Sequence, residues 1–458
     1  YGMSTEGIDK LLEKYPDTKL IVTTDNGIMA FEAVEYAISK GIDVVVTDHH
    51  EASADGRVPN AHAVINPKQE DCKYPFKELC GAGVIFKLMM LLYYKLGKNP
   101  KECYEVIDVV AMSTVGDVVP LVDENRIIVK AGLEEINKEE KLIWKVMREV
   151  FSDNFKPITN VNSRTLAFSY VPAVNACSRL LGNIEIPIEL FLMDDNEEAM
   201  TAMAEKMKGI NDERRAMSKD QFKGAVGLWD EDDDLGVIVV SHKEFHEGIV
   251  GIIAGNLKES FYRPSIVLTE DKNNPDILKG SGRSIEGFPM KDVLDSIQAK
   301  TGLLEKYGGH PMAAGLSIKK ENLLDFKIEL IYESQERLSE EDYIKKTLVD
   351  IALDESEFTY ELLDAIKNLE PYGTSFPEPI IGIRNFKANE GMVLGSEEQH
   401  IILKGNQVEI VNWYGSSEWK DLGSPMDNIY AIGRPEINDF NKKIQLICTQ
   451  PTDMRHIK

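Results

Sequence analysis

Two short apolar runs lie near the start of the chain. Residues 20–22 (L-I-V) and 44–46 (V-V-V) do not alternate with polar residues, which predicts short strands buried within a parallel sheet. Between them, apolar residues recur with helical spacing at positions 28, 31, 34 and 38, and Gly41 follows as a C-terminal cap. The first 50 residues therefore predict a β-α-β unit with parallel strands.

The hydrophobic pattern changes three times further along the chain. Residues 194–222 consist of good helix formers with a seam of Met203, Met207, Ile210 and Met217, which predicts a connecting helix. A new apolar core begins at residue 235, and its glycine-rich segments 279–284 and 308–315 predict loops. Short alternating runs in the last hundred residues predict an antiparallel β-barrel.

These patterns predict a multidomain α/β protein, because 458 residues are too many for one core. The expected parts are a parallel-sheet domain over 1–190, a connecting helix over 191–230, a mixed α/β domain over 231–335 and a β-barrel over 345–458. The apolar stretch from residue 82 to residue 94 is interrupted by Lys87 and predicts a buried helix rather than a membrane span.

Composition narrows the class of protein. Five cysteines without a C-x-x-C pair indicate reduced thiols and a cytoplasmic location. The net charge of −25 argues against binding nucleic acid by bulk electrostatics. It does not exclude a nuclease, because an acid-lined metal site carries negative charge until its cations bind.

Polar side chains follow both of the predicted N-terminal strands. Asp25 ends the first run in T-T-D-N-G, and Asp48, His49 and His50 end the second. A right-handed crossover places the carboxyl ends of these strands at one sheet edge, so Asp25 and His49 are expected side by side. Carboxylate and imidazole together suit a divalent metal. The alternative for an isolated His-His pair is a solvated loop or a hydrogen-bonded structural pair.

T-D-N-G followed by D-H-H resembles the second and third motifs of the DHH phosphoesterase superfamily, and the downstream chain is similar to its RecJ branch, the single-strand exonucleases. This resemblance implies that Asp25, His49 and Asp117, the last within V-G-D-V-V-P-L, are metal ligands. Taken alone, Asp117 before Pro120 is typical of a turn. The Asp-x-Asp that forms the first motif of the superfamily is not found in residues 1–19, so part of a two-metal ligand set is expected to be missing.

Residues 172–180, P-A-V-N-A-C-S-R-L, resemble a RecJ signature in which arginine is usual at Ala173 and glycine at Ser178. The retained residues, Asn175 and Arg179, are expected to bind substrate. Arg179 could contact a phosphate in bidentate fashion, and the alternative is an ion pair that holds two domains together.

The two glycine-rich segments resemble the substrate-binding loops of the DHH-associated domain. Glycines allow backbone N–H groups to approach a phosphate closely, while Arg283 and His310 would supply charge and hydrogen-bond donors. His246 could assist these residues, and the alternative, typical of a histidine at a helix start, is a structural role. The other substrate-binding residues expected in these segments are Lys279, Ser281, Gly282, Ser284, Gly308 and Gly309.

The C-terminal strands are similar to the OB-fold of RecJ proteins. OB-folds bind single strands on aromatic platforms, so Trp413 and Tyr414 are expected to stack on bases. The alternative for at least one of them is a place in the hydrophobic core.

The resemblance implies a metal-dependent exonuclease that removes mononucleotides from the 5′ end of single-stranded DNA in repair or recombination. Two Mn²⁺ or Mg²⁺ ions would activate a water. Asp48 would orient His49, and His50 would contact the scissile phosphate or the leaving oxygen. Arg283 and His310, with Arg179, would stabilise charge on the phosphoryl oxygens.

Two other functions stay open. A DHH-type phosphodiesterase on short oligonucleotides or cyclic dinucleotides would share the first two domains but generally lacks the barrel. A non-catalytic replication or recombination subunit would bind single strands without cleaving them. The expected partner is single-stranded DNA, with a single-strand-binding protein or a helicase as a further partner; the chain is expected to be a monomer without membrane association.

Overall fold

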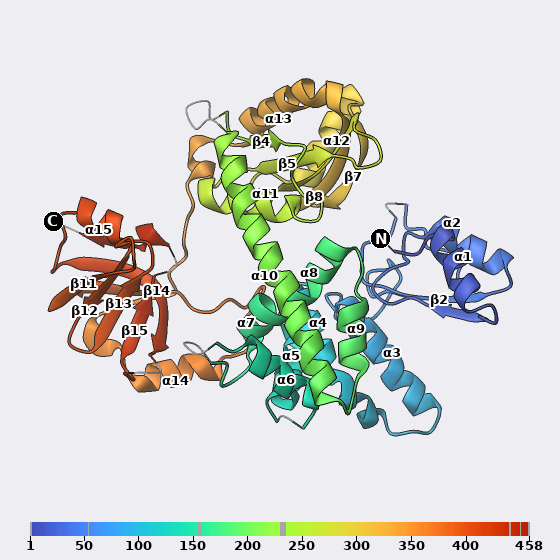
Figure 1. Cartoon of the computed structure of the whole chain (residues 1–458), viewed down its shortest axis with the longest axis horizontal. Coiled ribbons are helices and arrows are strands. Elements are labelled where there is room, and N and C mark those ends of the chain that lie inside the picture. The colour runs from blue at the N-terminus through green and yellow to red at the C-terminus, as the bar shows by residue number, and fades with distance from the viewer. Residues whose placement is uncertain are drawn as a thin grey trace. The chain divides into compact units, whose positions relative to one another are not determined.

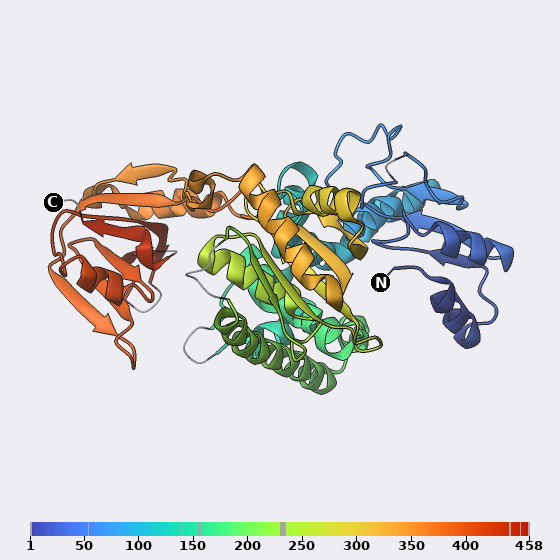
Figure 2. The same ribbon diagram turned by 90° about the horizontal axis from the view of Figure 1, so that it is seen from above.

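The computed structural model describes residues 2–53, 55–138, 140–153, 157–229, 235–438, 441–448 and 450–456. The chain folds into two compact units, whose elements Figures 1 and 2 show from two directions. The first unit comprises Tyr1–Trp144, Pro157–Val171 and Leu348–Lys458. The second comprises Lys145–Lys156 and Pro172–Thr347.

The N-terminal part of the first unit is a three-stranded parallel sheet in the order β1-β2-β3. Val44 and Val46 of the central strand are fully buried, whereas Leu20 and Val22 of the edge strand are 52% and 46% exposed. The predicted β-α-β unit is confirmed, but burial on both faces holds only for the central strand, because the edge strand has one neighbour among the described residues. The elements are α1 (Thr5–Lys14), β1 (Leu20–Val22), α2 (Phe31–Ser39), β2 (Asp43–Thr47) and β3 (Ala63–Ile65).

A group of helices follows this sheet. The predicted helix after residue 80 is present as α3, but only its first half is buried, and Leu91, Leu92 and Tyr94 are 52%, 48% and 67% exposed. Its expected burial is therefore wrong for the C-terminal half. The elements are α3 (Gly81–Lys95), η1 (Pro100–Val106), α4 (Ile107–Gly116), α5 (Asp123–Lys138), α6 (Leu142–Phe151), α7 (Ser163–Thr165), the π-helical turn η2 (Leu166–Tyr170) and α8 (Val171–Leu181).

The C-terminal part of the first unit is an eight-stranded sheet. Its strand order is β11-β12-β13-β15-β14-β10-β9, with β16 on β14. The observed sheet differs from the expected antiparallel barrel in two respects. The β9–β10 and β13–β15 pairs are parallel, and the described strands do not close into a ring. The elements are β9 (Ile351–Leu353), η6 (Glu355–Glu357), α14 (Tyr360–Asn368), β10 (Ile381–Phe386), β11 (Glu390–Leu394), β12 (His400–Lys404), β13 (Val408–Asn412), α15 (Ser416–Asp421), β14 (Ile429–Ile437), β15 (Ile444–Ile447), η7 (Pro451–Asp453) and β16 (Met454–His456).

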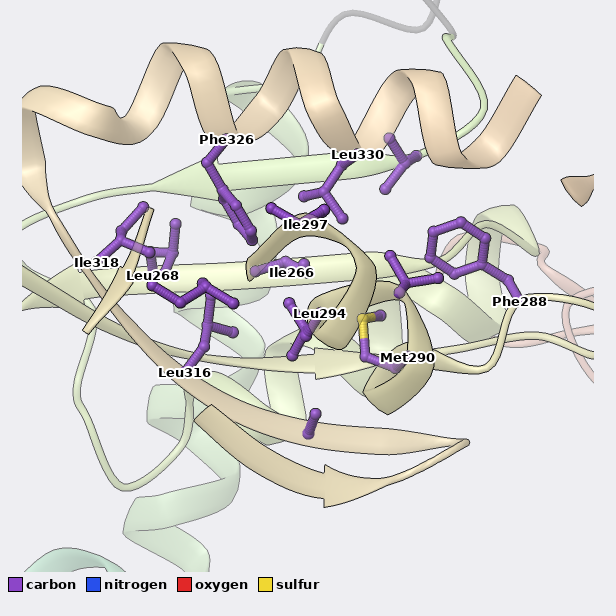
Figure 3. Close-up of a cluster of buried hydrophobic side chains, with 14 of the residues drawn as sticks. Ile266, Leu268, Phe288, Met290, Leu294, Ile297, Leu316, Ile318, Phe326 and Leu330 are labelled. Carbon is purple, nitrogen blue, oxygen red and sulfur yellow. The ribbon is translucent and has the colours of Figure 1, made fainter. Parts of the chain in front are cut away.

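The second unit is built on a mixed five-stranded sheet in the order β4-β5-β6-β8-β7. Figure 3 shows side chains of α12 and α13, including Leu294 and Phe326, packed over Ile266 and Leu316 of the sheet. A separate cluster joins the other face to α11 and the end of α10. The elements are α9 (Glu185–Leu192), α10 (Glu197–Gly227), β4 (Ile238–Ser241), α11 (Val250–Phe261), β5 (Ser265–Glu270), β6 (Ile277–Arg283), α12 (Met290–Thr301), β7 (Leu304–His310), β8 (Ala313–Lys319), η4 (Lys320–Asn322), α13 (Leu323–Arg337) and η5 (Glu340–Tyr343).

The predicted connecting helix is present as α10, but its expected seam is only partly correct. Of the four residues predicted to form it, Met207 is fully buried, and the other three are partly exposed. The buried stripe combines two methionines with shorter side chains. Its members are Met200, Ala204, Met207, Asn211, Ser218 and Ala225.

The two glycine-rich segments predicted as loops are strands. Residues 279–283 lie within β6, in the middle of the sheet, and residues 308–315 form the β7–β8 hairpin. A Cβ at Gly280 would lie 2.4 Å from the Val267 carbonyl oxygen, and one at Gly309 would lie 2.4 Å from that of Ala313. Glycine is therefore required here by the close approach of neighbouring strands, not by a loop.

The buried carboxylate of Glu333 gives this unit a pH-dependent stability. It accepts hydrogen bonds from Ser296 Oγ at 2.6 Å, Lys300 Nζ at 2.7 Å and Arg337 Nε at 2.7 Å. Burial raises its pKa, but these hydrogen bonds outweigh burial and lower the pKa to about 2.

We predict that Glu333→Gln lowers the free energy of unfolding at pH 7 by about 1–3 kcal/mol, because it removes the buried carboxylate that accepts charged hydrogen bonds from Lys300 and Arg337. The native pKa lies below the unfolded value of 4.5, so this stabilisation is present above pH 4.5 and is lost as the pH falls towards 2. Urea unfolding at pH 7 and pH 3 measures the effect. A wild-type advantage that is equally large at both pH values would contradict this assignment.

Candidate metal centre and substrate surface

The ends of β1 and β2 are fixed to each other by hydrogen bonds beyond the strand ladder. Thr47 Oγ1 donates to the Thr23 carbonyl at 2.6 Å, and the Asp25 N–H donates to the Thr47 carbonyl at 3.1 Å. Asp25 has a left-handed backbone (φ 66°), which Asp adopts more readily than most residues. The chain therefore turns at Asp25 and carries its carboxylate to the edge of the sheet at which His49 lies.

His49 lies between two carboxylates. Its Nε2 is 3.0 Å from Asp25 Oδ1 and 3.3 Å from Oδ2 of Asp117, the residue that follows α4. The sequence prediction that these three residues come together is met by the structure. Burial, together with the nearby charge of Asp25, raises the pKa of Asp117, although the two histidines act in the opposite direction.

The donor set fits a divalent cation. His49 Nε2 is buried and makes no hydrogen bond with a described residue, despite its short distances to the two carboxylates. A buried polar atom without a hydrogen bond costs about 1–3 kcal/mol, so a group that binds the nitrogen would remove this cost. Ligand atoms of Asp25, His49 and His50 also lie within 4.8 Å of one another. Imidazole nitrogen and carboxylate oxygen are ligands that Mn²⁺ accepts.

Asp48 holds His50, not the ring of His49. Its Oδ1 accepts from His50 Nδ1 at 2.7 Å and from the His49 N–H at 2.7 Å, while Oδ2 accepts from the Ile28 N–H at 2.9 Å. The expectation that Asp48 orients His49 is met only at the backbone N–H of His49. The ring that Asp48 holds is that of His50, because alternate side chains after a strand point the same way. Burial raises the pKa of Asp48, but these hydrogen bonds lower it to about 2. Asp48 is therefore ionised, His50 Nδ1 is the donor, and the pKa of His50 is raised.

Gly81 at the start of α3 contributes to the site and was not predicted to do so. A Cβ at Gly81 would lie 2.4 Å from Asp25 Cβ and 2.4 Å from Asp25 Oδ1. The preceding Cys80 caps the helix by accepting from the Gly83 N–H at 3.3 Å. In the sequence, L-C-G-A-G predicted only a core helix. The available signal was a glycine pair at a helix start, which allows close approach of backbone to a neighbour.

In the second unit, the two glycine-rich segments lie in register on β6, β8 and β7, with β8 between the other two strands. Arg283 of β6 and His310 of β7 are both paired with Ala313 of β8. One level further along, Gly282 and Gly309 are both paired with Ala314, followed by Ser281 and Gly308, both paired with Gly315. The structure therefore brings six of the residues predicted to bind substrate to one end of the sheet: Ser281, Gly282, Arg283, Gly308, Gly309 and His310.

Arg283 is the cationic group of this surface. Its Nη1 donates to Ser281 Oγ at 2.6 Å and to the Gly282 carbonyl at 2.8 Å. Burial and the nearby charge of Arg179 lower its pKa. A Cβ at Gly251 would lie 2.8 Å from Arg283 Nη2, so the first turn of α11 lies directly against the guanidinium. The hairpin residue His310 is exposed.

Arg179 and Asn175 are one turn apart on α8 and are both exposed. Arg179 Nη1 donates to the Gly248 carbonyl at 3.4 Å, and a Cβ at Gly248 would lie 2.1 Å from the Arg179 carbonyl oxygen. The helix and the turn before α11 therefore touch, which puts two arginines of the unit in electrostatic range of each other.

Three residues of the second unit are engaged in structural contacts. Ser284 is buried, and its hydroxyl donates to the Phe288 carbonyl, so its predicted substrate contact does not fit its position. Lys279 pairs with Asp271 at 2.6 Å and with Glu247 at 3.3 Å. His246 Nδ1 accepts from the Gly248 N–H at 3.1 Å, in agreement with the structural alternative given for it.

Trp413 and Tyr414 follow β13 and lie at the surface. They are 47% and 67% exposed, so the alternative that one belongs to the core is wrong. His400 packs edge-on against both, with ring centroids 5.0 Å from Trp413 and 4.7 Å from Tyr414.

The described helices include none long and apolar enough to cross a membrane.

Three family models match the chain. The DHH family N-terminal domain matches residues 4–114, the DHHA1 domain matches residues 234–335, and the RecJ OB domain matches residues 349–450. The expected OB-type fold of the last segment is thereby confirmed.

Curated relatives of the chain are single-stranded-DNA-specific exonucleases RecJ. The Haemophilus influenzae protein is 33% identical over 88% of this chain and 70% of its own length, and the Escherichia coli protein is 31% identical over 98% and 79%. The Bacillus subtilis protein is 33% identical over 98% of this chain, which spans only 55% of that relative.

Solved structures give the same result. A crystal structure of RecJ in complex with Mn²⁺ from Thermus thermophilus has a TM-score of 0.82 and 25% identity, covering 99% of this chain and 64% of that one. An exonuclease RecJ bound to manganese has a TM-score of 0.59 and 27% identity, covering 76% and 82%.

We predict that Gly81→Ala weakens Mn²⁺ binding at least tenfold while leaving the fold intact, because the new methyl displaces the Asp25 carboxylate. Isothermal titration calorimetry with MnCl₂ measures the affinity, and circular dichroism checks the fold. The control is Gly209→Ala in α10, where a Cβ meets nothing within 4 Å. Equal Mn²⁺ affinities for the two variants would contradict the role given to Gly81.

Proposed function

This chain belongs to the RecJ family of single-stranded-DNA-specific exonucleases, and from this we propose that it takes part in hydrolysis of single-stranded DNA, from the 5′ end, to mononucleotides. The observation that carries the proposal is the buried Nε2 of His49, which lies without a hydrogen bond between Asp25 and Asp117. Because an imidazole and two carboxylates converge there, the residues suit metal-assisted phosphodiester hydrolysis better than binding alone.

We propose two Mn²⁺ or Mg²⁺ ions in the complete centre, with Asp25, His49 and Asp117 among their ligands. When bound, such ions lower the pKa of a water and offset charge on the phosphoryl oxygens. The side chains of the protein position and protonate the reacting groups. Asp48 fixes the His50 ring through Nδ1 and raises its pKa, which favours the protonated ring; in that form His50 Nε2 can donate a proton to the leaving oxygen or a hydrogen bond to the scissile phosphate.

The second unit would hold the DNA backbone. Arg283 and Arg179 supply positive charge for a phosphate, His310 supplies a donor at the hairpin, and Asn175 lies one turn from Arg179. β6 is paired on both sides, whereas β7 has β8 as its one neighbour among the described strands, so backbone groups of Gly308 and Gly309 could reach the same ligand. We exclude Ser284, since it is buried, and give Lys279 a structural role. The further substrate-contacting residues are Ser281, Gly282, Gly308 and Gly309.

The OB domain would bind the strand beyond the reacting end. Trp413 and Tyr414 present exposed rings, and base–aromatic stacking on such rings is worth about 1–3 kcal/mol per base. We propose the domain bounds 1–190, 191–230, 231–335 and 345–458, a monomer acting in the cytoplasm, and a single-strand-binding protein or helicase as partner.

Two other functions make different predictions. A phosphodiesterase for short oligonucleotides or cyclic dinucleotides would have no use for residues 349–450, which match the RecJ OB domain. A non-catalytic subunit would have no use for a buried imidazole held beside two carboxylates. Both features favour the exonuclease.

The test is digestion of a single-stranded 30-mer, labelled at its 5′ end, with the same strand in a blunt duplex as comparison. It is run with Mn²⁺ on the chain and on a form extended ahead of residue 1 by a strand that carries the Asp-x-Asp motif of the family. We predict that labelled mononucleotide is released from the single strand and little from the duplex.

In the active form, His49→Ala and Asp25→Asn should each lower the rate at least a thousandfold, while the exposed Asp17→Asn serves as the matched control. Faster cleavage of a dinucleotide than of the 30-mer would favour the first alternative. Tight binding of the 30-mer without cleavage by either form would favour the second.

A further inference from the structure

A cavity of about 450 Å³ lies within the first unit, directly beside the residue predicted to be a metal ligand. Gly116 and Val118, the two neighbours of Asp117 in the chain, are in its wall. The opposite walls are the α7–η2 segment, a stretch from Glu370 to Glu378 that leads into the OB strands, and Arg434 of β14. A preformed space of this size is typical of sites for small ligands or single nucleotides.

Two unusual residues face this cavity from different elements. Val118 has a left-handed backbone (φ 62°) and is 66% exposed, although β-branched residues rarely adopt that conformation. Phe168 is 67% exposed and belongs to the π-helical turn η2, a rare form of helix that is frequently found at functional sites. Backbone strain and a π-turn that both present apolar groups to one space indicate a binding site.

The wall that leads into the OB strands is held rigidly. Arg126 donates to the carbonyls of Leu369 and Pro371, each at 2.5 Å, and its guanidinium lies 4.2 Å from the centre of the Phe376 ring. The Leu121 N–H donates to the Thr374 carbonyl at 2.7 Å. Because loop 118–121 and this wall are bonded to each other, the cavity is formed without a ligand and requires little ordering to bind one.

The polar groups of the cavity define the chemistry of its ligand. Arg164 is 64% exposed, lies 6.0 Å from the centre of the Phe168 ring and is 3.9 Å from Glu378. Arg434 Nε is 3.4 Å from the same carboxylate, and Glu370 is a second acid in the wall. Two arginines and two glutamates leave the lining close to neutral. This balance suits an aromatic ring with hydrogen-bonding edges and a single phosphate, rather than a multiply charged ligand.

We propose that this cavity binds one nucleotide of single-stranded DNA, with its base on Phe168 and its phosphate at Arg164. The proposal rests on the proposed function for the substrate class and adds a specific nucleotide subsite next to Asp117. A strand held here would be kept in place beside the candidate metal centre by a contact independent of the aromatic residues at the OB surface.

Equilibrium binding of 5′-fluorescein-labelled dT₁₂ tests the proposal. Fluorescence anisotropy is recorded in EDTA, so that no turnover is needed and a failure of the exonuclease assignment does not affect the result. Phe168→Ala should raise Kd roughly 5- to 100-fold, because it removes a stacking surface. Ala167→Trp, which fills the cavity, should have a similar effect. Tyr94→Ala, at an equally exposed aromatic residue of α3, should leave Kd within twofold.

Two further measurements locate the nucleotide. Arg164→Ala should lower the slope of log Kd against log salt by about 0.7, as expected for one single-strand phosphate contact. Photolysis of a dT₁₂ strand that carries 5-iodo-deoxyuridine should crosslink the peptide containing Phe168. Unchanged affinity in Phe168→Ala and Ala167→Trp, or crosslinks only to peptides outside the cavity wall, would overturn the proposal.

Discussion

The candidate metal centre depends on the position of one imidazole nitrogen. His49 Nε2 is buried and lies 3.0 Å and 3.3 Å from two carboxylates that come from separate parts of the chain. Each neighbouring feature maintains this arrangement. The β1–β2 pairing sets the level of Asp25, the end of α4 carries Asp117, and the absence of a side chain at Gly81 leaves room for the Asp25 carboxylate. The local folding of the first 117 residues therefore assembles a ligand set in which an unbound imidazole nitrogen costs about 1–3 kcal/mol, a cost that a bound group would remove.

The second unit positions its polar residues through the register of its strands. Its glycine-rich strands lie in register, so that Arg283 and His310 are both paired with the same residue of β8. Glycine permits this close strand packing, and the first turn of α11 closes against the guanidinium. Chemistry-bearing side chains are thus fixed by rigid sheet geometry rather than by loops, which favours precise placement of a phosphate.

Much of this could be predicted from the sequence. The apolar runs before Asp25 and Asp48, with a helical pattern between them, were sufficient to place Asp25 beside His49, because parallel strands share one edge for their carboxyl ends. Local patterns failed where tertiary contact decides. The glycines of β6 and β7 predict loops when taken alone, yet the close approach of neighbouring strands requires them. The partner of Asp48 is His50 because the side chains of both residues turn to the same side after the strand. Val118 and Phe168 gave no local signal, since their significance lies in residues distant in sequence. The glycine pair at the start of α3 signalled close approach to a neighbour, but it did not identify that neighbour as Asp25.

The most direct test of the central claim is anomalous diffraction at the manganese edge from crystals soaked in MnCl₂. The account predicts an anomalous peak within about 2.0–2.4 Å of His49 Nε2 and of carboxylate oxygens of Asp25 and Asp117, at coordination distance. An ordered His49 with no peak beside it, or manganese bound only at other acidic residues, would contradict the account.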